Sequence, residues 1–256
     1  MHKRIRLASL GAALLAVLAF TAFATTSAFG AARFSNCPQT NPAVLFCINV
    51  QSTSGNLRIK NNNVPLNGSI VIDGGVVRDV DNLYHLVTIS GTGFTADPVP
   101  VPGGLLGLDL PFHSPNDVFA TAQAVGTIRF DSTSQFPPKV TVPLRVKLSN
   151  PFLGNSCYIG SSLFPITLNQ ITGTTNPPPP NQPISGTPGT LQPDPTDPSV
   201  IQVTGTSYVD NAFSVPLAFG CGLLQDAAID LKLGLPSAAG NNEARLNPTV
   251  SILNLQ

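Results

Sequence analysis

The chain has 256 residues, only 10% of them charged, and its 13 basic residues balance its 13 acidic ones. This inventory excludes nucleic-acid binding, which needs a strongly basic surface, and electrostatic docking on anionic lipid. With 22 Gly and 25 Pro, the composition favours short strands joined by turns over helices.

The N-terminus has the three parts of a secretory signal peptide. Three positive charges in Met1–Arg6 precede an uncharged apolar run, Leu7–Ala24, and small residues follow. A transmembrane anchor, which needs about 20 apolar residues, is the alternative. We expect cleavage near Ala28 to Ala32, without lipid attachment, and a mature protein that is extracellular or loosely associated with the cell wall. Removing residues 1–32 leaves 10 basic against 13 acidic residues, a net charge of −3.

The four cysteines, Cys37, Cys47, Cys157 and Cys221, are even in number, which in an exported chain indicates disulfides. Zinc binding would need closer Cys or His pairs. Of the three possible pairings we favour Cys37–Cys47 and Cys157–Cys221. The first pair lies within one short segment. The second closes a long loop, which stabilises by about 4 kcal/mol in the chain-entropy model, against about 3 for the short one.

The N-terminal half is predicted to form a meander of short strands at 45–50, 57–60, 64–66, 69–72, 76–78 and 85–90. Turn signals separate them at Asn61–Asn63, Asn67-Gly68 (a strong hairpin signal) and Asp73–Gly75. Asp73, Asp79 and Asp81 also suggest a calcium site, but they lack the spacing of a calcium loop. We favour turn-forming acids instead.

The middle of the chain holds an apolar segment, Pro98–Phe112, which Pro and Gly interrupt. It is interpreted either as an exposed loop for a lipid, an envelope polymer or a partner protein, or as a loop folded over the end of the core. We favour the second interpretation. Ser114 and Pro115 are typical of a helix start and predict a short helix over 117–124. A strand is expected at 122–130.

The clearest strand is Lys139–Leu148, where apolar residues alternate strictly with polar ones. This period of two predicts a sheet with one buried and one solvated face. Pro143 cannot donate a ladder hydrogen bond, so we expect an edge strand or a bulge.

The C-terminal part predicts strands at 164–171, 201–209, 213–218 and 249–253 and a short helix at 223–231. A Pro-rich stretch, 172–198, interrupts it as a loop or a linker. We favour a single β domain over 33–256 that contains this stretch. The predicted fold class is all-β: an antiparallel β-sandwich (jelly-roll or Ig-like) with one or two short helices.

Catalytic signatures are weak in this sequence. His85 and His113 are the histidines after the signal peptide, and no Gly-x-Ser-x-Gly motif is present. Glu243 is the only Glu, and the absence of Trp argues against a carbohydrate-binding module. We therefore predict a protein that is not an enzyme and has no cofactor or metal site.

Three stretches, Asn150–Ser161, Pro177–Gly189 and Leu235–Asn242, together resemble a group of uncharacterised exported proteins of actinobacteria. The resemblance covers the C-terminal half. It implies an extracellular location and a structural role for Cys157, but no activity or ligand. The sequence predicts a structural or binding role, with an envelope component or a protein as partner. The alternatives are a lipid- or polymer-binding module that uses the Pro98–Phe112 loop, and a secreted hydrolase with an unrecognised site.

Overall fold

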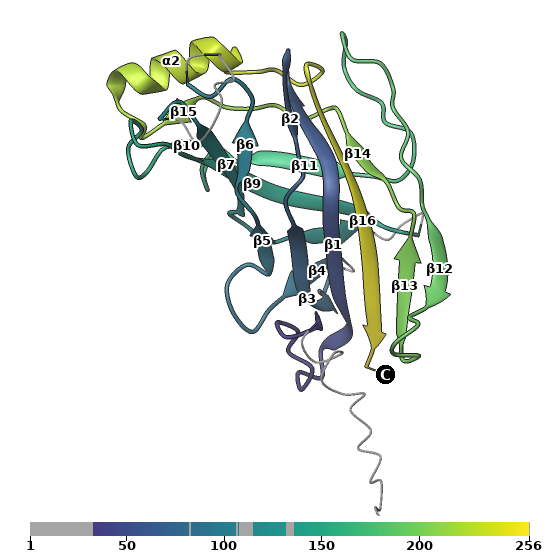
Figure 1. Ribbon diagram of the computed structural model, residues 1–256. Helices are drawn as coiled ribbons and strands as arrows, with labels where there is room; N and C mark the ends of the chain where they lie inside the picture. The colour runs from purple at the N-terminus through teal and green to yellow at the C-terminus, as the bar shows by residue number, and fades with distance from the viewer. Residues whose placement is uncertain (1–32, 82, 106, 108–114, 132–135, 256) are drawn as a thin grey trace, which may run out of the picture.

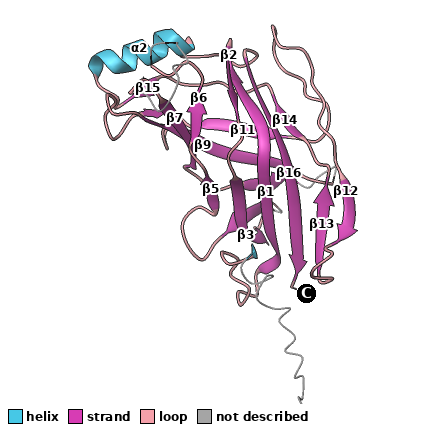
Figure 2. Cartoon of the chain, viewed as in Figure 1, coloured by secondary structure: helices cyan, strands magenta, loops and turns pink. Residues whose placement is uncertain are grey.

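The computed structural model describes residues 33–81, 83–105, 107, 115–131 and 136–255. The predicted signal peptide, residues 1–32, lies outside these residues. Sixteen described strands form one antiparallel sheet, and a single described helix accompanies it (Figure 2). The expected all-β, sandwich-like fold is confirmed. Nowhere in the described ranges is there a helix of the length and apolar character needed to cross a membrane.

The strands in chain order are β1 Val44–Ile59, β2 Asn62–Pro65, β3 Ile70–Arg78, β4 Tyr84–Val87, β5 Phe94–Ala96, β6 Val99–Val101, β7 Val118–Ala124, β8 Arg129–Asp131, β9 Lys139–Ser149, β10 Tyr158–Ile159, β11 Ile166–Gln170, β12 Thr190–Pro193, β13 Val200–Thr204, β14 Tyr208–Asp210, β15 Ala218–Phe219 and β16 Asn242–Asn254. The helix is α2, Leu223–Leu233, which confirms the helix predicted at 223–231. It ends at Gly234, whose left-handed backbone (φ 68°) suits glycine.

The sheet closes on itself. Its path runs from β16 through β1, β3, β4 and β8 to β9, and β11 pairs with β9 while β14 pairs with β16. The backbones of Ile171 and Val209 exchange two hydrogen bonds (3.0 and 2.8 Å), which join the end of β11 to β14. In Figure 1, β9 and β11 pass behind β1 and β16. The closed sheet therefore has an inner face that surrounds a shared interior and an outer face toward solvent.

Strand β3 passes straight through Asp73-Gly74-Gly75, so the turn predicted there is wrong. Gly74 and Gly75 pair with Ile48 and Cys47 of β1. A Cβ on Gly75 would lie 2.7 Å from the Val44 side chain, and one on Gly74 would lie 2.7 Å from the carbonyl oxygen of Val87. The glycines are thus in the strand because neighbouring groups approach its backbone closely.

The hairpin predicted at Asn67-Gly68 is also wrong. Strands β2 and β3 both pair antiparallel with β1, so the chain keeps its direction from β2 to β3. The chain instead reverses at Lys60 and Asn61, between the paired residues Ile59 and Asn62. Lys60 there has a positive φ of 51°. Asn67-Gly68 therefore marks an interruption in an extended segment.

The helix predicted over 117–124 is wrong as well, because Val118–Ala124 is strand β7. Its alanines, Ala120 and Ala122 among them, face the same side as their β9 partners Leu148 and Val146. Alanine favours helices, but pairing with the long strand β9 overrides that propensity.

Strand β9 confirms the alternation predicted for 139–148, although it is not an edge strand. It pairs with β7 and β8 on one side and with β10 and β11 on the other. Pro143 lies opposite the interruption between β8 and β7, where its carbonyl accepts the amide of Val125 (2.9 Å). Its missing N–H faces this gap in the ladder, so an interior strand accommodates the proline.

Both expected disulfides are present. Cys37–Cys47 ties the segment before β1 to the outer face of β1, with a Cα–Cα distance of 5.7 Å. It forms an outer hydrophobic cluster with Phe34, Val44, Val77 and Val200. Cys157–Cys221 joins the start of β10 to the start of α2, with a Cα–Cα distance of 4.0 Å. Its two cysteines belong to the main core.

The Pro-rich stretch 172–198 lies along the outside of the closed sheet. Isolated bridges join Thr174 to Ser185 and Thr187 to Ser207, and Thr190–Pro193 within the stretch form β12. Strand β16, which follows this stretch, pairs with β1 along nearly its whole length. Strands from both sides of the stretch therefore build the same sheet.

Candidate functional site

The inner face of the sheet surrounds an apolar cavity of about 640 Å³. Its volume lies within the ~300–1,000 Å³ typical of small-molecule sites. Strands β1, β3, β9, β11 and β16 supply most of the wall. The lining residues are Phe46, Ile48, Val50, Ser52, Leu57, Leu66, Ile70, Ile72, Val76, Tyr84, Phe94, Ala122, Phe130, Phe136, Pro137, Pro138, Val140, Val142, Leu144, Val146, Ile166, Leu168, Gln170, Tyr208, Ala244, Leu246, Pro248, Val250 and Ile252.

The alternation of the long strands positions these side chains. In β9, every second residue from Val140 to Val146 faces the cavity, while Thr141, Arg145 and Lys147 belong to the opposite set. Most inward residues are Val, Ile, Leu or Ala, and short side chains on a curved wall do not fill the centre. A continuous apolar space results.

An empty apolar space of this size is energetically costly. Its wall is almost wholly apolar, and contact between apolar surface and water is unfavourable. Water does not offset this cost well, because cavities lined by Leu, Ile and Phe stay dry and take up apolar molecules instead. The apolar wall therefore suits an apolar molecule better than it suits water.

Four side chains of the wall, those of Ser52, Tyr84, Gln170 and Tyr208, carry a polar group. The Ser52 hydroxyl donates to the carbonyl oxygen of Ser54 (3.0 Å), and the Tyr208 hydroxyl donates to that of Pro138 (3.1 Å). Burial raises the pKa of Tyr208 well above its ordinary value, so the phenol stays neutral. Gln170 is 3% exposed, and neither atom of its side-chain amide has a hydrogen-bond partner.

The lining reaches the surface at Phe136, whose side chain lines the cavity although the residue is 53% exposed. Pro137 and Pro138 continue this part of the wall into β9. No Lys, Arg, His, Asp or Glu is among the described lining residues. The cavity therefore suits an uncharged, largely apolar molecule.

The acids suggested as a calcium site are spread out. Asp73 is in the middle of β3, whereas Asp79 and Asp81 follow its end, six or more residues along an extended chain, which spans about 20 Å. Asp79 accepts the amides of Asp81 and Leu83 (3.0 and 2.9 Å), which confirms its role in a turn. Within the described ranges, no group of three or more His, Cys, Asp or Glu could hold a metal ion.

Asp73 does not form a turn, contrary to the prediction. It lines a smaller hollow of about 330 Å³ on the outer face and accepts the amide of Asn36 (3.1 Å). Burial, opposed by hydrogen bonds from Asn36 and Ser35, raises the pKa of its carboxyl group. His85 is in β4, 3.9 Å from Asp79, and is not among the lining residues of the large cavity. His113 lies outside the described residues.

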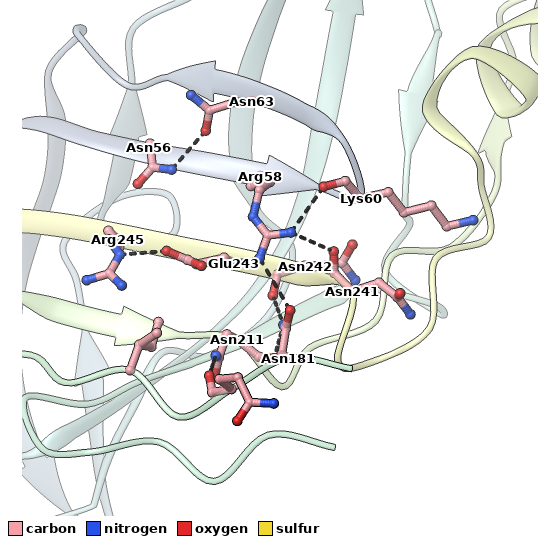
Figure 3. Close-up of polar contacts among 12 residues, drawn as sticks. Asn56, Arg58, Lys60, Asn63, Asn181, Asn211, Asn241, Asn242, Glu243 and Arg245 are labelled. Carbon is pink, nitrogen blue, oxygen red and sulfur yellow. Dashed lines mark hydrogen bonds and ion pairs between the residues drawn. The ribbon is translucent and has the colours of Figure 1, made fainter. Parts of the chain in front are cut away.

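Glu243, the single Glu of the chain, is held in an outer-face network (Figure 3). Arg245 and Arg58 donate to its carboxylate (2.6 and 3.2 Å). Burial opposes ionisation, but these hydrogen bonds and charges hold the pKa of Glu243 below its usual value. Arg58 also donates to Asn181, whose amide donates to the carbonyl oxygens of Asn211 and Asn242 (2.9 and 2.7 Å). The network thus fixes the Pro-rich stretch to β1 and β16.

The apolar segment Pro98–Phe112 is only partly described. Its first residues form β6, which pairs with β7, and Val99 is buried. Residues 106 and 108–112 lie outside the described residues. Within the described part of the segment, Val99–Val101 belong to the sheet, and Leu105 packs against the main core.

Sequence reasoning missed the cavity, although its signal is partly visible. The alternating rows of β9 and β16 reveal an apolar inner face. The volume enclosed between them depends on the closure at Ile171 and Val209, which no local pattern encodes.

Comparison with protein-family models, with curated proteins and with solved structures found no match to this chain.

Proposed function

We propose that this protein is a non-catalytic, exported binding protein that holds an apolar molecule, of acyl-chain type, inside its closed sheet. The observation that carries the proposal is the cavity of about 640 Å³ with its almost wholly apolar wall. An apolar wall in contact with water favours an apolar occupant, and the size of the cavity suits a single small molecule. An apolar component of the cell envelope fits this chemistry.

Export is part of the same proposal. The N-terminal pattern and the resemblance to exported proteins support it, and the two disulfides are typical of oxidising compartments. The interior cavity replaces the Pro98–Phe112 loop as the binding element in this proposal. His85, Asp73 and Glu243 do not line the cavity, which favours binding over a hydrolase.

A fluorescence titration tests the proposal. The neutral probe N-phenyl-1-naphthylamine, added to the purified protein, is expected to bind with a blue-shifted, enhanced emission. Ala122 of β7 lines the cavity beside its pairing partner on β9, Val146. Ala122→Phe therefore fills part of the cavity and should weaken probe binding at least about tenfold.

The matched control is Val80→Phe, at a residue that is 98% exposed, and it should leave probe binding unchanged. Thermal melts of both variants confirm that each is folded. Equal binding of the probe by wild type and a folded Ala122→Phe variant, or no binding by wild type, would overturn the proposal.

A further inference from the structure

Gln170 occupies an unusual place in the cavity wall. It ends the inward row of β11, after Ile166 and Leu168, and its Cα partner on β9 is Val140. All of these neighbours are apolar. A Leu or Val at position 170 would complete the apolar wall.

The amide of Gln170 has no hydrogen-bond partner on either atom, although the residue is only 3% exposed. The other buried amides of the described residues, those of Asn116, Asn211 and Asn242, each have at least one hydrogen-bond partner, although Asn211 Oδ1 has none. Asn242, for example, donates to the carbonyl oxygens of Phe213 and Ala238 and accepts the hydroxyl of Ser237. Most buried polar groups in proteins are hydrogen-bonded, so an exception on a cavity wall points to a partner outside the chain.

The position of Gln170 also orients an occupant. Val140, its Cα partner, is two residues from Pro138, whose carbonyl holds Tyr208, and four from the half-exposed Phe136. Gln170 therefore lies at the Phe136 end of the cavity. The other end of its row, Ile166, faces Leu144 and the apolar remainder of β9.

The chemistry of the amide narrows the ligand class. An amide both donates and accepts, so its best partner is a group that also does both, such as a hydroxyl or another amide. An ionised carboxylate only accepts, and no described lining residue carries a charge that would balance it.

We propose that Gln170 is the polar recognition residue of the cavity, and that the ligand is a single-chain amphiphile with a neutral hydroxyl or amide head. The head hydrogen-bonds to Gln170 near Phe136, and the chain extends along the inward residues of β9 and β1. This inference rests on the proposed function of the cavity.

The test compares three ligands of equal chain length that displace N-phenyl-1-naphthylamine: dodecan-1-ol, dodecane and dodecanoate at pH 8. Wild type should bind dodecan-1-ol roughly tenfold more tightly than dodecane, which corresponds to one buried hydrogen bond. Dodecanoate should bind more weakly than the alcohol. Gln170→Met, which keeps the length of the side chain, should remove the preference for the alcohol, so that dodecan-1-ol and dodecane bind with affinities within about twofold of each other.

Gln192→Met, at an exposed residue of β12, is the matched control and should keep the wild-type preference. If the Gln170→Met variant does not fold, the side-chain amide resonances of ¹⁵N-glutamine-labelled wild type give the answer. One of them, at Gln170, should shift with dodecan-1-ol and not with dodecane.

The outcomes separate the two proposals. Binding of dodecane and dodecan-1-ol with equal affinity, or a preference that survives in Gln170→Met, overturns the role of Gln170 and leaves the apolar cavity site intact. Displacement of the probe by none of the three ligands overturns both.

Discussion

The two faces of the closed sheet are built by the same strands and have opposite character. On β1 and β16 the outer face carries Arg58, Glu243 and Arg245, and their hydrogen bonds anchor Asn181 of the Pro-rich stretch. The inner residues of the same strands are apolar except for Ser52, and they line the cavity. Arg58, Glu243 and Arg245 find their partners within the chain, whereas neither amide atom of Gln170 inside has a partner. This contrast teaches that the same strands use their outer residues for contacts within the chain and their inner residues to line a cavity.

Removing the disulfides should have the largest effects on stability. One disulfide lies in the main core and the other in the outer cluster, so their removal compares the two regions directly. Replacing Cys157 and Cys221 by Ser should lower the free energy of unfolding by about 4 kcal/mol, because the bridge spans 64 residues. Replacing Cys37 and Cys47, only 10 residues apart, should cost about 3 kcal/mol. Urea unfolding of both double variants under non-reducing conditions measures the difference. A larger loss from the outer pair would contradict this ranking.

A substitution at Asp194 tests how much a buried ion pair away from the cavity contributes to stability. Its buried carboxylate pairs with Arg33 and accepts hydrogen bonds from Thr196 and Gln202. Asp194→Asn should cost about 3 kcal/mol, since it breaks a buried ion pair. Probe binding in the cavity should be unchanged. Urea unfolding at pH 7 and probe titration of the same variant check both expectations.

The same carboxyl group predicts a pH dependence. The hydrogen bond from Arg33, and then those from Thr196, hold the pKa of Asp194 far below its ordinary value of 3.8. Its contribution to stability is therefore complete above about pH 5 and declines as the pH falls through the ordinary range and toward the lowered pKa. Wild type should lose more stability than Asp194→Asn between pH 5 and pH 2.5. Parallel losses in the two proteins would disprove this assignment.

Glu243→Gln is a milder change on the outer face. It keeps the shape of the side chain and removes the charge that Arg58 and Arg245 contact, so the expected cost is about 1.5 kcal/mol. Because the pKa of Glu243 is lowered, this contribution is present above about pH 5 and is lost on acidification. Thermal melts at 0.05 and 0.5 M NaCl should show a smaller difference between variant and wild type at high salt.

A substitution on the inner face should raise the free energy of unfolding instead of lowering it. Gln170→Met removes an unpartnered buried amide, so the ligand-free protein should gain up to about 1 kcal/mol in unfolding free energy. Delipidated protein, refolded from denaturant before the urea titration, provides this measurement. A loss of stability comparable to that of Glu243→Gln would show that the amide is satisfied in the folded chain.

Patterns within one segment predicted the fold best. The alternation of 139–148 identifies β9, the composition of 223–231 identifies α2, and the closeness of Cys37 and Cys47 in one short segment favours the observed pairing. Local signals failed where a distant segment decides the structure. Gly74 and Gly75 are typical turn residues, but Val44 and Val87 require them in β3. The candidate site is harder still to predict from the sequence, because the enclosed volume depends on the closure of the whole sheet.

The nine prolines of the stretch 172–198 have a consequence for the unfolded protein. A proline ring fixes its own φ in any state of the chain, so this segment has fewer conformations to lose when the protein folds. The four hydrogen bonds that Asn181 makes therefore order a segment that is already stiff, at a small entropic cost. A Gly- and Ser-rich segment of equal length would lose more conformational entropy, so it would need more contacts to be ordered against β1 and β16.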